Sequence, residues 1–227
     1  MEELLAQPFL GIIITIIFYA IGVWIRKKVP SPFVNPLLIA VILMILLFVL
    51  TPLTPEQYQV GGGMVSMFIL PATVGLALYV YHHWVLFKAN IVPILTGCLA
   101  GSAGSLFSIW GMCRLFGIDD LIRFSLLPKS VTTAIAVELS EQKGGIPAIT
   151  IFAVILTGIS STVLSPFMIK LFKLKDPVAT GVAFGTSGHA LATTKALEMG
   201  EIEGAMSGVS IGLSGLLTSI LYIVFFR

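Results

Sequence analysis

Long apolar runs without charged residues recur along this chain, and they constrain its fold more than any other feature. Several runs approach the length of about 20 residues that spans a lipid bilayer as a helix. Of the 227 residues, 57% are hydrophobic and only 11% are charged, which is far from the balance of a soluble domain. A transmembrane barrel would show alternating segments of about 10 residues instead. The sequence therefore predicts an all-α polytopic membrane protein, a single transmembrane domain over 1–227 with about 7–8 hydrophobic segments.

The apolar runs and the polar stretches between them define the expected segments. We expect long apolar segments at 9–25, 33–50, 64–80, 91–113, 146–169 and 203–226. Turn-forming and charged residues gather at 51–63 and 114–125, which we interpret as connections. The first apolar run lacks the basic leader and the cleavage site of a signal peptide, so we interpret it as a retained helix.

Basic residues indicate which segments cross the membrane. The triplet Arg26, Lys27 and Lys28 should be cytoplasmic by the positive-inside rule, which places the N-terminus outside. Two further basic sites should share the cytoplasmic side: Lys88, and the cluster Lys170, Lys173 and Lys175. An even number of crossings must then separate these two sites, yet three segments lie between them. We therefore predict that the shortest one, 126–139, is re-entrant or broken.

A short internal repeat supports this interpretation. The pattern LPx(T/S)VxxA occurs at 70–77 and 127–134, and the tetrapeptide ILTG follows each time, at 94–97 and 155–158. With 126–139 re-entrant, the two ILTG segments run in opposite directions. Inverted repeats with discontinuous helices that meet near the bilayer midplane are typical of secondary transporters. We predict such repeats at about 33–113 and 118–226.

The first polar stretch, LLPKSVTTAIAVEL at 126–139, has the composition of an anion site. Pro128 suits the first turn of a helix, where the following N–H groups have no intrahelical acceptors. A full positive charge and several hydroxyl donors are added there by Lys129, Ser130, Thr132 and Thr133. Such a helix start suits a carboxylate or a phosphate. Alternatively, Lys129 extends to the interface and the hydroxyls bond backward to carbonyls.

The second polar stretch, AFGTSGHALATTKALE at 183–198, is too polar and too rich in small residues for a lipid-facing helix. Its glycines can unwind the helix, which is tolerated at membrane depth only beside a cavity or within protein. His189 and Thr193 are spaced to share one helix face, next to Thr186 and Ser187. The imidazole could bind substrate or take up a proton near neutral pH. Alternatively, it forms an interhelical hydrogen bond.

Six residues are secondary candidates. Asn35 fits a helix cap better than a site, and Glu138 and Lys195 fit a solvated interface better than a cation or proton site. The others belong to the two copies of the LPx(T/S) pattern: Pro71, Thr73 and Pro128. Catalytic and metal-ligand motifs are missing, and Cys98 and Cys113 have no metal-ligand spacing. We expect no enzymatic activity, no cofactor, no metal and, with a net charge of +2 and no basic patch, no nucleic-acid partner.

Several blocks resemble the LrgB/CidB family over nearly the whole chain. They are LPKSVTT, the GG-P-A turn at 144–148, G-x-A-x-G-T at 181–186, His189, Thr193, and EGA at 203–205. Four positions depart from the family pattern: Ala134 replaces a frequent Pro, Gly188 a Ser, Ala192 a Gly and Lys195 an Arg. Ala134 removes an expected second proline kink, and Lys195 replaces a fork-shaped donor by a point charge.

The resemblance implies two functions. One is a holin/antiholin-like role with a small LrgA/CidA-type membrane partner, which modulates murein hydrolase activity and cell lysis. The other is transport of small monocarboxylates, such as pyruvate in bacteria or glycolate and glycerate in the related plastid transporter. The chain lacks a transit peptide and a fused LrgA-like half, so it resembles the stand-alone form in the bacterial cell (inner/plasma) membrane.

A buried cation beside a helix start favours the carrier over a lytic pore. We therefore predict a monocarboxylate transporter that forms a homo-oligomer. Lys129 and the N–H groups after Pro128 bind the carboxylate, and Ser130, Thr132, Thr133 and Thr193 contact the rest. His189 binds substrate or couples a proton. The alternative is the holin/antiholin-like role.

Overall fold

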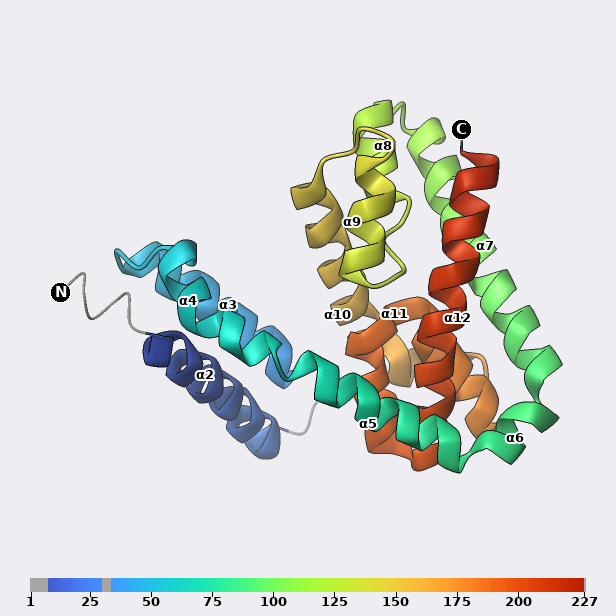
Figure 1. Cartoon of the computed structure of the whole chain (residues 1–227), viewed down its shortest axis with the longest axis horizontal. Helices are drawn as coiled ribbons and strands as arrows, with labels where there is room; N and C mark the ends of the chain where they lie inside the picture. The colour runs from blue at the N-terminus through green and yellow to red at the C-terminus, as the bar shows by residue number, and fades with distance from the viewer. Residues whose placement is uncertain (1–7, 30–33, 227) are drawn as a thin grey trace. The chain divides into compact units, whose positions relative to one another are not determined.

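Helices joined by short turns and loops make up the part of the chain that its structure describes. The computed structural model describes residues 8–29 and 34–226, so the first residues and the start of the predicted segment 33–50 lie outside it. The helices are α2 Pro8–Lys28, α3 Pro36–Leu50, α4 Pro55–Ser66, α5 Ile69–His82, α6 Trp84–Ala89, α7 Ile91–Leu115, α8 Asp120–Leu126, α9 Thr133–Glu141, α10 Pro147–Leu171, α11 Pro177–Met199 and α12 Glu201–Phe225 (Figure 1). Five helical stretches are long and apolar enough to cross a membrane: Phe9–Lys28, Pro55–His82, Ile91–Leu115, Pro147–Leu171 and Glu201–Phe225. The predicted all-α polytopic membrane fold is confirmed.

Residues 1–75 form the first of two compact units, and the second comprises residues 76–227. In the first unit, α2 packs against α3 and α4. Asn35 caps α3, because its side-chain Oδ1 accepts a hydrogen bond of 2.8 Å from the Leu37 N–H. The predicted connection 51–63 is wrong, since α4 occupies much of it. Thr54 and Gln57 form a capping box that starts this helix. The single domain predicted for 1–227 stays a prediction.

In the second unit, three long helices set the frame: α7, α10 and α12. The helices α7 and α12 run in parallel, because Ile94 packs with Met206 near their starts and the Phe107 ring lies 5.6 Å from that of Phe225 near their ends. The helix α10 runs the other way. It begins where α9 ends, with Thr150 Oγ1 2.8 Å from Ser140 Oγ.

The short helices α8 and α9 form a re-entrant hairpin, which we call hairpin 1 (residues 120–141). Leu127 and Leu139 both pack with Tyr222, near the C-terminal end of α12, while Val131 packs deeper, against Val154. After α8 the chain thus runs toward Val154 of α10, and it returns through α9 to the C-terminal end of α12, where it entered. Figure 1 shows both helices beside the C-terminal part of α12. The predicted break in segment 126–139 is confirmed, and its re-entrant course in the membrane stays a prediction.

The long helix α11 is a second hairpin, hairpin 2 (residues 177–199), which is folded at His189. The backbone of His189 has φ 41° and ψ −134°, which interrupts the helix. On the way in, Gly181 approaches Met206 of α12; on the way out, Leu197 approaches Gly204. Both arms of hairpin 2 therefore lie beside the N-terminal part of α12, opposite to hairpin 1. The predicted helix discontinuity is present.

The two hairpins belong to an inverted pair of structural repeats. In each repeat a 25-residue helix, α7 or α10, is followed by a hairpin that enters from the end where that helix stops. The ILTG segments lie in these antiparallel helices, as the sequence predicts. The copies of LPx(T/S)VxxA differ, however: 70–77 lies within α5 and 127–134 forms the break between α8 and α9. The repeat limits predicted at 33–113 and 118–226 stay a prediction.

Cysteine labelling from the two sides of the membrane tests the hairpins. In a variant without Cys98 and Cys113, cysteines at Asp119 and Gln142 flank hairpin 1 and should be labelled by a membrane-impermeant maleimide from one side. Cysteines at Lys175 and Gly200 flank hairpin 2 and should be labelled from the other side only. Labelling of Asp119→Cys and Gln142→Cys from opposite sides would show that hairpin 1 crosses the membrane.

Candidate functional site

The tips of the two hairpins meet beside one cavity in the second unit. This cavity has a volume of about 690 Å³ and lies between α7 and α10, which both pack against α11. Lys129 and Ser130 of hairpin 1 line it, and so do Thr186 and Ser187 of hairpin 2. Each hairpin thus contributes two polar residues at the depth where the helices are broken.

Pro128 shapes the tip of hairpin 1, although not as the sequence predicts. Pro128 has no N–H to continue the α8 hydrogen-bond ladder, so α8 ends before it. The carbonyl of Phe124 that is left without this donor accepts a long hydrogen bond of 3.5 Å from the Tyr222 hydroxyl. The N–H of Lys129 donates to the Leu126 carbonyl at 3.2 Å, and the N–H of Val131 donates to the Pro128 carbonyl. The predicted helix start at Pro128 is therefore wrong, and the N–H groups of Lys129 and Val131 are not free.

The next helix, α9, begins only at Thr133, with Thr132 as its N-cap residue. The Thr132 side chain forms no capping hydrogen bond, and Thr133 is exposed. Neither residue lines the cavity. The assignment of Thr132 and Thr133 to substrate binding stays a prediction.

Lys129 is the charged residue of the cavity wall. Within the described ranges 8–29 and 34–226, no carboxylate forms an ion pair with it. The nearby ionisable group is His189, which interacts electrostatically with Lys129. A partly buried cation without a counter-ion is costly, so it is typical of a site that receives an anion.

His189 forms the tip of hairpin 2, and the protein encloses it almost completely. Its side chain is only 4% exposed, and the backbone of Val154 on α10 hydrogen bonds with the imidazole. The other ring nitrogen, Nε2, is buried and has no hydrogen-bond partner in the protein. An unpaired buried polar atom near a cation without a carboxylate partner is a feature that is more common at functional sites than in packed cores.

The other predicted residues of hairpin 2 differ in their contacts. Thr186 lines the main cavity and also a second cavity of about 510 Å³ between α7 and the start of α11. Thr193 is buried, and its hydroxyl is engaged by the His189 carbonyl at 2.8 Å and by Ser207 Oγ at 2.7 Å. Thr193 does not line the cavity. Its predicted contact with substrate stays untested.

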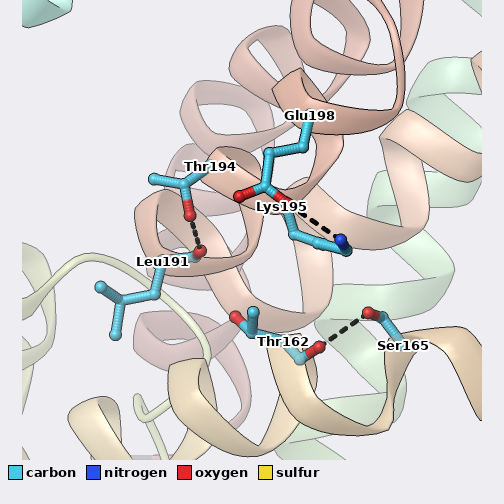
Figure 2. A network of polar contacts seen from close by, with 6 residues as sticks. All are labelled: Thr162, Ser165, Leu191, Thr194, Lys195 and Glu198. Atoms are coloured by element: carbon cyan, nitrogen blue, oxygen red, sulfur yellow. Dashed lines mark hydrogen bonds and ion pairs between the residues drawn. The ribbon is translucent and has the colours of Figure 1, made fainter. Parts of the chain in front are cut away.

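The remaining secondary candidates are not among the residues that line the cavity. Pro71 and Thr73 lie within α5, where Thr73 Oγ1 donates to the Ile69 carbonyl at 2.8 Å. Glu138 is exposed on α9. Lys195 forms an ion pair of 2.9 Å with Glu198 on the outgoing arm of hairpin 2 (Figure 2).

The sequence reasoning missed the part of the cavity wall that α7 and α10 supply. These helices contribute a row of hydroxyls: Ser105, Ser108, Thr157, Ser160, Ser161 and Ser165. These hydroxyls recur at a spacing of three or four residues inside apolar runs, which places them on one helix face. This spacing was the sequence feature that could have indicated them. Pro166 gave a second signal, since it leaves the Thr162 carbonyl without a helix donor. Ser165 Oγ donates to that carbonyl at 2.8 Å (Figure 2).

Comparison with known proteins identifies the family. The LrgB-like family matches residues 15–227. The chain belongs to this family. Antiholin-like proteins LrgB of Bacillus mycoides, Bacillus cereus and Bacillus anthracis are each 36% identical over 219 residues, which cover 96% of this chain and 95% of theirs. The resemblance to the LrgB/CidB family is thereby confirmed. No solved structure shows a significant match to this LrgB-like chain.

Proposed function

We propose that this LrgB-like protein is a membrane carrier for small monocarboxylates such as pyruvate, glycolate or lactate. The observation that carries the proposal is the unpaired Lys129 on the cavity wall, where the tips of two opposed hairpins meet. Broken helices inside inverted repeats are the arrangement in which secondary transporters bind their substrates. No catalytic step is part of the proposal.

The charge and the hydroxyls of the cavity favour a small monoanion. Lys129 pairs with one carboxylate, whereas a dicarboxylate would bring a second charge that no residue of the cavity wall neutralises. The hydroxyls of Ser130 and Ser187 line the same cavity and can donate to substrate oxygens. Apolar residues such as Phe152 and Leu156 complete the wall and suit a short carbon chain.

His189 supplies a route to proton coupling, although it lies behind the cavity wall and does not line the cavity. Lys129 and a protonated His189 repel each other, and a carboxylate paired with Lys129 reduces the repulsion. Substrate and proton would then bind together and be carried together. This part of the proposal predicts that a pH gradient drives accumulation.

The proposal places the protein in the bacterial cytoplasmic membrane. The relatives named above are bacterial proteins that share nearly its full length. In the second unit, Lys88 and the cluster of Lys170, Lys173 and Lys175 flank the ends of α7 and α10 that lie together, and the positive-inside rule makes that end cytoplasmic. We further propose a homo-oligomer and a small LrgA/CidA-type membrane partner, as the family membership suggests.

A second function is favoured by the names of the relatives, which are antiholin-like proteins. In that role the protein would modulate murein hydrolase activity and cell lysis together with its membrane partner. A purely structural regulator has no need of an unpaired cation in a cavity, and for this reason we place the carrier first. A change in organic-acid or proton balance could connect the two functions.

Uptake into proteoliposomes separates the two functions. We expect saturable uptake of labelled pyruvate, glycolate or lactate, which a pH gradient, acidic outside, increases. The measurement is made with and without a small LrgA-type partner, because the partner could be required. Leakage of a large dye without saturation would favour the holin-like role. If neither uptake nor leakage is observed with the partner present, the result contradicts the carrier and favours a regulatory role.

A further inference from the structure

The tip of hairpin 2 has a backbone conformation that must be held in place. His189 has a positive φ of 41°, which residues with a side chain rarely adopt. Such a conformation persists only where the surrounding contacts determine it, and it is concentrated at functional sites. The relevant contacts are those that hold the carbonyls on either side of the tip.

One contact comes from within hairpin 2 and continues to α12. Thr193 Oγ1 donates to the His189 carbonyl at 2.8 Å, and the same oxygen lies 2.7 Å from Ser207 Oγ. The single hydroxyl proton of Thr193 is used on the carbonyl, so Ser207 must donate to Thr193. Thr193 is 3% exposed and Ser207 is fully buried. This pair ties the outgoing arm of the tip to α12.

A second contact holds the incoming arm. Ser161 Oγ on α10 donates to the Ser187 carbonyl at 3.0 Å. The tip is thus fixed from α10 on one side and from α12 on the other. Ser161 lines the cavity, whereas Thr193 and Ser207 do not. The α12 contact can therefore be removed without altering the cavity wall.

We propose that Thr193 and Ser207 are positioning residues, which hold the backbone of the hairpin 2 tip so that the His189 side chain stays buried beside Lys129. This assigns Thr193 a role through His189 instead of a direct contact with substrate. The expected effect on transport depends on the proposed carrier function, but the position of the imidazole can be measured without it.

Chemical modification of His189 tests the proposal directly. Modification by diethyl pyrocarbonate, followed by mass spectrometry, measures the accessibility of the ring in the reconstituted protein. Thr193→Val removes the hydroxyl at nearly constant volume and should speed the modification about tenfold, as expected for the loss of one buried hydrogen bond. Thr193→Ser keeps the hydroxyl and should react like the wild type.

The matched control is Thr194→Val. Thr194 is the next residue, and its hydroxyl donates to the Leu191 carbonyl at 2.7 Å, away from the tip contact (Figure 2). This variant should leave the modification rate unchanged. If Thr193→Val fails to insert, Ser207→Ala removes the same contact from α12 and should speed the modification in the same direction.

Uptake by the same variants distinguishes the two proposals. With a working carrier, Thr193→Val should raise KM about tenfold with little change in maximal rate, and Thr193→Ser should restore it. Faster modification in a protein that carries no substrate would support the positioning role and contradict the carrier. Modification of both Thr193→Val and Ser207→Ala at the wild-type rate would overturn the positioning role.

Discussion

Replacing Lys129 by Met should abolish saturable uptake while leaving the protein folded. Removal of one partner of a buried charge pair costs roughly 2–5 kcal/mol of binding free energy, so uptake efficiency should fall about 30-fold or more. Folding should not suffer, because Lys129 has no carboxylate partner among the described residues and an unpaired buried charge destabilises the folded state. The melting temperature should therefore stay equal or rise.

The measurement is initial uptake by proteoliposomes together with thermal unfolding in detergent. Lys88→Met is the matched control, since Lys88 is exposed on α6 and stacks on Trp84 with 5.3 Å between Nζ and the ring centre. It removes the same charge at a residue that does not line the cavity, and it should transport normally. Lys129→Arg keeps the charge and should retain part of the activity. Wild-type uptake by Lys129→Met would exclude Lys129 from the site and remove the main support for a carrier.

Hairpin 1 could be predicted from the sequence because polar residues are expensive in a membrane. Lys129 and its neighbouring hydroxyls could not belong to an ordinary lipid-facing span, and the charge distribution required a segment that does not cross. The exact start of α9 could not be predicted in the same way. Pro128 fits the first turn of a helix and equally fits the end of one. In the structure α8 ends before Pro128, and the Tyr222 hydroxyl donates to the Phe124 carbonyl that is left without a helix donor.

The second break could be located only to within a polar stretch. Gly181, Gly185 and Gly188 could each have formed the kink, yet Gly181 and Gly185 serve close packing and the chain turns at His189. A non-glycine residue at the turn is not predictable from local preference, because tertiary contacts impose it. The hydroxyls of α7 and α10 were missed for another reason: a helix can satisfy a serine or threonine with its own backbone, so sequence alone does not distinguish a cavity wall from a packed face.

The capping box of α4 shows the opposite case, in which a local signal was present and was outweighed. Thr54, Pro55 and Gln57 are typical of a helix start. The glycines at 61–63 and the polar composition led to the interpretation of a connection. Glycine in a helix costs only about 1 kcal/mol relative to alanine, which a hydrophobic environment that requires internal hydrogen bonds readily overcomes.

Among substitutions that add a single methyl group to hairpin 2, Gly185→Ala should destabilise the folded protein the most. A Cβ at this position would lie 2.7 Å from the Ser210 Cβ and would also collide with the Ser207 carbonyl of α12. A backbone carbonyl inside a long helix cannot move aside as a flexible side chain can. Overpacking of this kind costs about 1–3 kcal/mol, and contact with backbone places the effect at about 3 kcal/mol or more. We expect a clear fall in melting temperature.

Gly212→Ala provides the control on the same helix that hairpin 2 packs against. Gly212 is exposed on α12, and no atom lies within 4 Å of the Cβ that the substitution adds. Alanine favours a helix over glycine by about 1 kcal/mol, so this variant should be as stable as the wild type or more so. If both variants melted like the wild type, α11 could not pack against α12 at Gly185. The folded-back hairpin would then be wrong, and with it the meeting of His189 and Lys129 on which the carrier depends.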